Sequence, residues 1–228
     1  MNAALATAPT GATPPTPVTV RVAAPGEYDA VRALLLRAYE SRFWITSSYR
    51  ESLLDIEGHV ADHGPDGPRG EDLVLAVGDA GDAGDADDAG GHRILGAVFV
   101  PRDTQTGPDG AVEQSFGRLG VAPEAAGRGI ARVLVEHIEA LARGRGASRI
   151  AIHSGPQMHG AHRMYEHLGY LRRPEREDLV VDSGQRLLVY TRELGEPEAM
   201  PRASGPPARP DDPRTDPALR APDPRSTP

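Results

Sequence analysis

The segment at residues 119–141 limits the possible folds more than any other part of the chain. It reads LGVAPEAAGRGIARVLVEHIEAL: a short apolar run, a proline, two glycines on either side of an arginine, and a long run with apolar residues at helical spacing. This order predicts a strand over 115–121, a sharp turn, and an amphipathic helix over 129–143. Gly144 and Gly146 follow as a helix-ending signal.

The rest of the chain alternates between strand and helix patterns around this unit. Period-two or short apolar runs predict further strands, and apolar stripes at helical spacing predict further helices. The expected strands are 18–23, 72–77, 93–100, 149–153 and 187–194, and the expected helices are 27–39, 48–61 and 160–168. We therefore expect a mixed α/β (α+β) domain, with a mostly antiparallel sheet flanked by helices and one strand–helix–strand crossover.

Three segments lack the apolar residues that a core requires. Residues 1–17 are rich in Ala, Thr and Pro, residues 81–91 consist mainly of Gly, Ala and Asp, and residues 195–228 are rich in Pro. Burial in these segments cannot offset the entropy lost on ordering. We expect disordered tails at 1–17 and 195–228, a flexible acidic loop at 81–91, and a single folded domain over 18–194.

Charge and cysteine content exclude several classes of function. The formal net charge is −8, and a nucleic-acid-binding surface would need a basic stripe instead. The chain has no cysteine, which excludes a disulfide framework, a thiolate metal site and a cysteine nucleophile. No apolar run reaches membrane-spanning length, and the N-terminus lacks a signal-peptide pattern. We expect a cytoplasmic protein without nucleic-acid or membrane partners; a homodimer stays open.

The glycine turn has the features of an anion site. Amides in the first turn of a helix lack internal partners, and the helix dipole adds positive charge there. Gly127 and Gly129 permit a sharp turn and a close approach of ligand, and Arg128 and Arg132 add charge. Arg132 stands where a dinucleotide fingerprint needs its third glycine, and a P-loop lysine is absent. A phosphate site and a mere strand–helix connection both stay open on this evidence.

A second motif, AHRMYEHLGY at residues 161–170, distinguishes between these alternatives. Together with the turn about 35 residues earlier, it resembles the GNAT superfamily of acetyl-CoA-dependent N-acetyltransferases. The turn is similar to the family's [QR]-x-x-G-x-[GA] segment, and the later motif to its A-x-x-x-Y-E-x-x-G-[FY] segment. The resemblance is strongest over 119–170 and extends more weakly, through the element order, over 18–194.

The resemblance implies a V-shaped splay between the two central strands and a CoA site at the turn. Main-chain groups of Leu119 and Val121 would pair with the pantetheine arm. The residues implied in pyrophosphate binding are Ala126, Gly127, Arg128, Gly129, Ile130 and Ala131. The thioester would lie in the cleft beside the acceptor amine, and the protein would align the two and stabilise the developing charge.

Two residues are candidates for proton transfer. Tyr165 matches the family's tyrosine near the CoA sulfur, where a phenol can protonate the departing thiolate; the alternative is a tyrosine buried against the sheet. Glu113 lies two residues before Ser115, the position at which many relatives carry a base. It could act through a water, or it could be a solvated carboxylate at a strand end.

The sequence departs from the family pattern at Ala126, where Arg or Gln is usual, at Met158, where Asn is frequent, and at Ser115. Each departure removes one expected side-chain contact. Main-chain donors should preserve CoA binding nevertheless.

Other candidates are histidines and aromatic residues. His153 ends a predicted strand beside the cleft and is either a base or substrate contact or a structural histidine. His159, His162 and His167 form no i, i+4 ligand pair, so we expect no metal. Trp44 and Tyr49 are candidates for the wall of the acceptor site, and we expect Phe43 in the core.

The predicted function is acetyl transfer from acetyl-CoA to a primary amine of a small molecule, peptide or protein, by direct attack in a ternary complex. The alternative is a regulatory module of the same fold that binds CoA or acyl-CoA and catalyses poorly. An acidic chain could attract cationic amines, but the acidic loop and tails could also place that charge far from the cleft.

Overall fold

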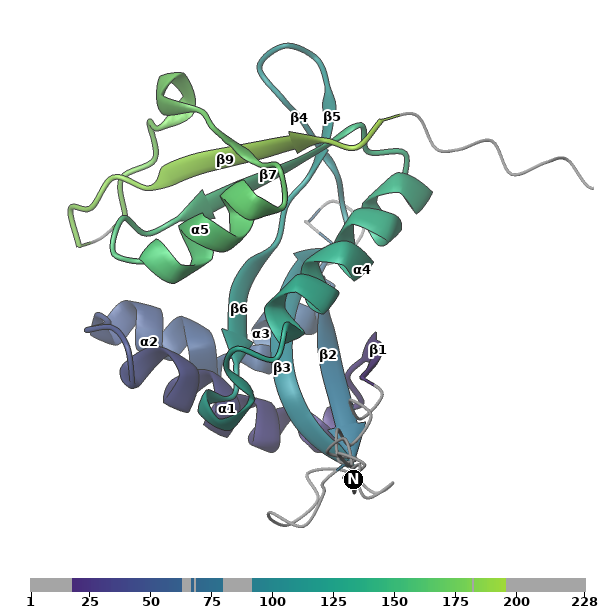
Figure 1. Cartoon of the computed structure of the whole chain (residues 1–228), viewed down its shortest axis with the longest axis vertical. Helices are drawn as coiled ribbons and strands as arrows, with labels where there is room; N and C mark the ends of the chain where they lie inside the picture. The colour runs from purple at the N-terminus through teal and green to yellow at the C-terminus, as the bar shows by residue number, and fades with distance from the viewer. Residues whose placement is uncertain (1–17, 63–66, 68, 80–91, 182, 196–228) are drawn as a thin grey trace, which may run out of the picture. The chain divides into compact units, whose positions relative to one another are not determined.

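Two β-sheets that separate within the segment 112–121 organise the protein (Figure 1). The computed structural model describes residues 18–62, 67, 69–79, 92–181 and 183–195. These described residues all belong to one structural unit. The predicted disordered segments 1–17 and 81–91 lie outside the described residues, and so does the predicted C-terminal tail apart from Gly195.

The first sheet is antiparallel throughout. Its strands, in spatial order, are β1 (Thr19–Val22), β2 (Glu71–Asp79), β3 (His92–Pro101) and β6 (Gly117–Val121). The long β2–β3 ladder, in which Val74 faces Val98, confirms the hairpin predicted from the sequence. Most of the side chains of β3 are buried, as expected for a strand covered on both faces.

The second sheet contains one parallel pair. Its strands, in spatial order, are β4 (Gln105–Thr106), β5 (Val112–Gln114), β7 (Arg149–Ser154), β9 (Leu188–Glu193) and β8 (Leu171–Arg172). β5 and β7 run parallel, with Glu113 opposite Arg149, and the other neighbours are antiparallel. The two-residue strands β4 and β8 are too short to give a periodic signal, and the sequence did not predict them.

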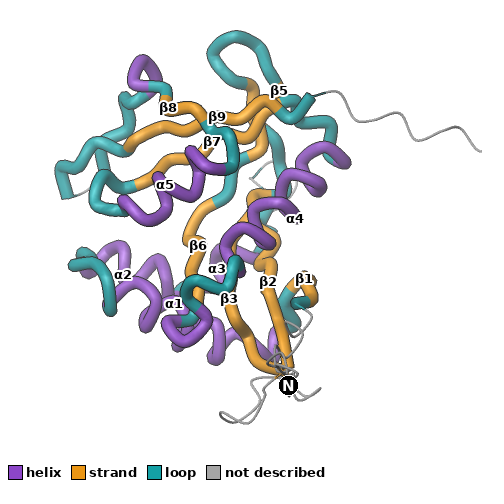
Figure 2. Tube along the Cα trace, viewed as in Figure 1, coloured by secondary structure: helices purple, strands orange, loops and turns teal. Residues whose placement is uncertain are grey.

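The strand predicted over 115–121 is confirmed as β6, but it begins at Gly117, and the sequence did not predict the separate strand β5 before it. β5 pairs with β7, whereas β6, only two residues later, pairs with β3 in the other sheet. The β3–β6 register shifts between Ala97 and Phe99, and Arg118 in β6 has a φ of 49°. Such an irregularity bends a strand away from its neighbour. β6 and β7 therefore diverge, which confirms the predicted V shape (Figure 2).

The helices agree with the sequence except at one point (Figure 2). They are α1 (Tyr28–Glu40), α2 (Ser47–Leu54), α3 (Ile56–Val60), α4 (Ile130–Gly144) and α5 (His159–His167). The prediction of one continuous helix over 48–61 was wrong. Asp55 has a ψ of 62°, outside the helical region, and its carboxylate accepts the N–H of Gly58 to begin a new helix.

α1 and α4 cover opposite faces of the first sheet. A Cβ at Gly96 of β3 would lie 2.9 Å from Ile130 in α4, and one at Gly120 of β6 would lie 2.8 Å from Leu35 in α1. Gly120 is opposite Ala97, the next residue after Gly96, so the two glycines point to opposite faces. The missing side chains let both helices approach closely and form one core with the sheet.

Within the described ranges, every helix is too short or too polar to span a bilayer.

Candidate functional site

A cleft of about 510 Å³ opens where the two sheets diverge. One wall comes from residues 117–119 of β6 and from the end of α1 with its connection to α2. The opposite wall comes from residues 152–154 of β7, from α5, and from the connection that leads into β9. The splay thus exposes the edges of two strands inside a partly enclosed space.

Tyr165 reaches this cleft from α5. Its side chain is only 5% exposed, and its ring lies 6.2 Å from that of Phe116 and 5.7 Å from that of Tyr190. Burial raises the pKa of the Tyr165 phenol well above its ordinary value, with a smaller contribution from Tyr49. The phenol is therefore protonated at neutral pH and can donate a hydrogen bond or a proton.

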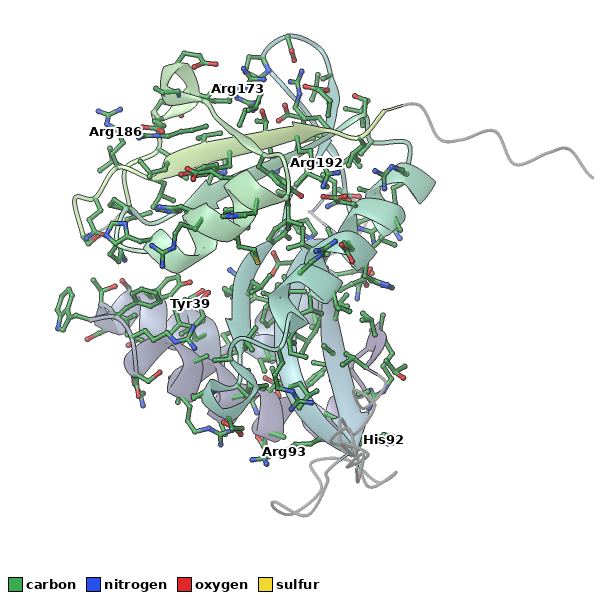
Figure 3. All side chains as sticks on the ribbon, viewed as in Figure 1. Tyr39, His92, Arg93, Arg173, Arg186 and Arg192 are labelled. Carbon is green, nitrogen blue, oxygen red and sulfur yellow. The ribbon has the colours of Figure 1, made fainter. Side chains whose placement is uncertain are left out.

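Aromatic residues from α1, α2 and their connection line the other wall. Tyr39 donates a hydrogen bond of 3.2 Å to the carbonyl of Leu119, and its ring lies 5.5 Å from that of Tyr49. Figure 3 shows Tyr39 on the side of α1 that faces the second sheet. Trp44 is 83% exposed at the cleft, whereas Phe43 packs against the core as expected.

Arg118 lines the cleft in a left-handed backbone conformation. Its guanidinium forms an ion pair with Glu71 and lies 4.7 Å from the centre of the Phe99 ring. Its buried Nε has no hydrogen-bond partner among the described residues. No local sequence pattern indicates this residue, because the strand irregularity that orients it depends on pairing with β3.

Glu113, the predicted base, lies outside the cleft. Its side chain is 6% exposed and is bound by Arg176 at 2.8 Å through each carboxylate oxygen and by Arg149 at 2.9 Å. Burial acts to raise the pKa of Glu113, but the two guanidiniums outweigh it and hold that pKa below its usual range. A carboxylate held this way is a weak proton acceptor. The ion pairs of Glu113 join β5, β7 and the segment after β8.

His153 of β7 lines the cleft, as the sequence predicted, and its partly exposed side chain also lines a neighbouring hollow with Arg176 and Asp178. Burial, followed by the positive charge of Arg176, lowers the pKa of its imidazole below the ordinary value. The ring is therefore neutral at pH 7 and can accept a proton. His162, in contrast, is buried, with its Nε2 3.1 Å from Ser154 Oγ and its ring stacked on Tyr190.

The glycine turn follows β6 through the short 3₁₀ helix η2 (Pro123–Ala125). Gly127 and Gly129 have φ angles of 77° and 80°, which favour glycine, and a Cβ at either position would meet nothing within 4 Å. The turn is exposed and leads directly into α4. Both glycines are therefore required by the backbone, and the space before them is open.

The main-chain donors of the turn divide into two groups. The N–H of Ala126 donates to Pro123 and that of Arg128 to Ala125, so these two predicted pyrophosphate donors are already satisfied by the protein. No acceptor among the described residues bonds the remaining predicted donors, and no side chain caps α4. These are the N–H groups of Gly127, Gly129, Ile130 and Ala131. Four donors at a helix N-terminus suit an anion with several oxygens.

Only some of the other residues predicted to contact CoA line the cleft. Leu119 lines the cleft, whereas Val121 lies two residues further along β6 and does not line it. The side chain of Ile130 is buried in the core, so only its main chain is available to a ligand. Met158, at the position where Asn is frequent, lines the cleft and lies 3.7 Å from Ser154 through its sulfur.

Gln157 also lines the cleft, and sequence reasoning did not identify it. Its buried Oε1 has no hydrogen-bond partner among the described residues. Its position next to Met158 was the only signal in the sequence. Within the described part of the chain, no group of three or more His, Asp or Glu side chains could hold a metal ion.

One segment of the chain is similar to a known protein family. Residues 86–170 match the family model of the acetyltransferase (GNAT) family. None of the curated proteins matches the chain in sequence. The recognised resemblance is thus confirmed over the segment that carries both motifs.

Solved structures share the fold at low sequence identity. A GNAT family acetyltransferase from Staphylococcus aureus is 14% identical, with a TM-score of 0.56 over 78% of this chain and 99% of that chain. A GNAT family N-acetyltransferase from Escherichia coli, solved in complex with CoA, is 16% identical, with a TM-score of 0.53 over 81% of this chain and 86% of that one. A transcriptional regulator from Bacillus halodurans is 20% identical, with a TM-score of 0.51 over 72% and 98%.

Proposed function

We propose that the protein transfers an acetyl group from acetyl-CoA to a primary amine, because residues 86–170 match the family model of the acetyltransferase (GNAT) family. The amine attacks the thioester directly, with both substrates bound. The activity resides in residues 18–194. The observation that carries this proposal is the row of four unpaired main-chain donors at the start of α4, directly after the strand that lines the cleft.

In this proposal the pyrophosphate of CoA binds to the N–H groups of Gly127, Gly129, Ile130 and Ala131. The open space before the two glycines and the dipole of α4 support this position. Ala126 and Arg128 contribute by shaping the turn, since their own N–H groups are occupied. The charged side chain of Arg128 remains exposed toward solvent, where it can add attraction for phosphate.

The pantetheine arm then follows β6 into the cleft, past Val121 and Leu119. The Tyr39 hydroxyl bonds the Leu119 carbonyl and helps to fix this strand. The thioester comes to lie near Tyr165, which is the only residue of the later motif AHRMYEHLGY that we assign to proton transfer. Alignment of the amine and the thioester carbonyl supplies much of the rate gain in reactions of this kind.

The chemical step exchanges one bond for another. The amine nitrogen forms a bond to the carbonyl carbon, and the bond from that carbon to sulfur breaks. Tyr165 donates its proton to the departing thiolate, and His153 accepts the proton that the amine releases. Both residues line the cleft and are in the required protonation states near neutral pH.

The test uses the purified full-length chain with acetyl-CoA and a panel of primary amines. Release of free thiol that depends on both protein and amine, with an acetylated product identified by mass spectrometry, is the expected result. Thermal stabilisation by CoA without turnover of any amine would overturn the proposal and leave a CoA-binding regulatory module. Failure of CoA to stabilise the protein would overturn both the acetyl-transfer proposal and the alternative of a CoA-binding module.

A further inference from the structure

The described lining of the cleft includes one arginine and no carboxylate. The arginine in the described lining is Arg118. Its ion-pair partner, Glu71, does not line the cleft. His153 adds no negative charge and is neutral near pH 7 because its pKa is lowered. This contrasts with the formal net charge of −8 of the whole chain.

Carboxylates close to the cleft are held by arginines instead of facing into it. Glu113 is bound by Arg176 and Arg149, and Glu177 by Arg172. Asp178 lines the neighbouring hollow beside His153 and does not line this cleft. The net charge of the whole chain therefore does not indicate whether this cleft prefers cations.

The mouth of the cleft is apolar on both walls. Trp44, in the connection between α1 and α2, is 83% exposed. Leu179 and Val180, which precede β9 on the opposite wall, are 45% and 51% exposed. Of the large hydrophobic side chains that the described chain exposes, half lie at this one opening; the others, such as Leu171, lie elsewhere. Exposed apolar groups that gather at a cleft indicate a ligand that covers them.

We infer that the acceptor is a monoamine: one primary amino group on an aromatic or long apolar body without a second positive charge. This inference rests on the proposed acetyl transfer. The attacking amine must be neutral, so a monoamine carries no charge at the moment of attack. A diamine or polyamine retains an ammonium group, which would lose water without gaining a carboxylate from the described lining. Trp44, Leu179 and Val180 contact the apolar body.

A matched pair of amines tests the charge rule. Hexylamine and hexamethylenediamine have the same carbon chain and differ by one amino group. We expect kcat/KM for hexylamine to exceed that for the diamine at least tenfold, and phenethylamine to be acetylated as well as hexylamine or better. If the diamine or a polyamine is the better acceptor, the inference is overturned while acetyl transfer stands. If no amine is acetylated, the proposed function fails, and this inference with it.

Variants at the mouth test the apolar contact. Trp44→Ala should raise KM for phenethylamine at least fivefold and leave CoA binding unchanged, whereas Leu171→Ala, at a residue 59% exposed away from the cleft, should change neither. Leu179→Asp should raise kcat/KM for hexamethylenediamine, and Leu171→Asp should not. Equal KM values for Trp44→Ala and the unaltered protein, together with no gain from Leu179→Asp, would overturn the assignment of the mouth to the acceptor.

Discussion

Arg176 binds Glu113 through two parallel hydrogen bonds of 2.8 Å, one to each carboxylate oxygen. Arg149, opposite Glu113 in the parallel β5–β7 pair, adds a third of 2.9 Å. These contacts close the end of the second sheet just before β6 leaves it. We therefore propose that the carboxylate stabilises the point from which the two sheets diverge.

Glu113→Gln should lower the free energy of unfolding by about 2 kcal/mol at pH 7, because charge-assisted hydrogen bonds to two arginines are lost. The pKa of Glu113 is lowered in the folded state, so its stabilisation is present above the ordinary carboxyl pKa and is lost as pH falls through the folded value. The loss of unfolding free energy between pH 7 and pH 4, measured by urea unfolding, should be smaller in the variant than in the unaltered protein.

The exposed Glu175 nearby provides a control, since Glu175→Gln should change neither quantity. Turnover by Glu113→Gln should stay within about threefold of the unaltered protein once folding is ensured. A loss of a hundredfold in kcat in a stably folded variant would restore Glu113 as the base.

Tyr165→Phe should reduce kcat about a hundredfold, which is the usual scale for loss of a proton donor. The ring and its packing against Phe116 and Tyr190 remain, so CoA should bind with unchanged affinity. Steady-state kinetics with calorimetric CoA titration measures both. An unchanged kcat would reject the acid role, and weaker CoA binding with unchanged kcat would assign the phenol to positioning.

His153→Gln tests the base through its pH dependence. The lowered pKa of His153 keeps it deprotonated at neutral pH, so kcat/KM should fall only as pH drops through a value below 6.5. In the variant this acid limb should disappear and the rate should fall about tenfold or more. His159→Gln, at an exposed histidine outside the cleft, should retain the original profile; an acid limb that persists in His153→Gln would point to another base.

His162 should make stability depend on pH in a different window. Burial lowers its pKa in the folded state, so below pH 6.5 the unfolded chain takes up a proton that the folded chain does not. The melting temperature should therefore fall from pH 7 toward pH 5, and His162→Gln should reduce this fall. The exposed His167 is a matched control on the same helix. The same dependence of melting temperature on pH in the unaltered protein, His162→Gln and His167→Gln would contradict the account.

Local patterns in the sequence predicted most of the fold. The glycines at 127 and 129 indicated the turn, and the apolar stripe after them indicated α4. The break at Asp55 was missed because the apolar stripe continues across it, while the capping bond to Gly58 depends on one side chain. The sequence did not predict β5, because three residues give no periodic signal and its pairing with β7, instead of with β3, depends on the tertiary structure.

Parts of the site depend on contacts between residues distant in sequence. Tyr165 could be placed because a local motif surrounds it. The ion pairs of Glu113 could not be predicted, because its partners Arg149 and Arg176 come from elements far along the chain. The orientation of Arg118 depends on a register shift against β3, for which the sequence of β6 alone carries no pattern.

The turn provides a direct test of the central claim, with a control glycine beyond the other end of the same helix. Gly129 precedes α4 and Gly146 follows it; both have a φ of 80° and open space where a Cβ would lie, so tryptophan imposes the same backbone strain at either end. Only the indole at position 129 would obstruct the four unpaired N–H groups.

The decisive measurement is a calorimetric titration of CoA into Gly129→Trp and Gly146→Trp, each confirmed as folded. The account predicts that CoA binds at least tenfold more weakly to Gly129→Trp and with unaltered affinity to Gly146→Trp. Equal, undiminished affinity in both variants would contradict it.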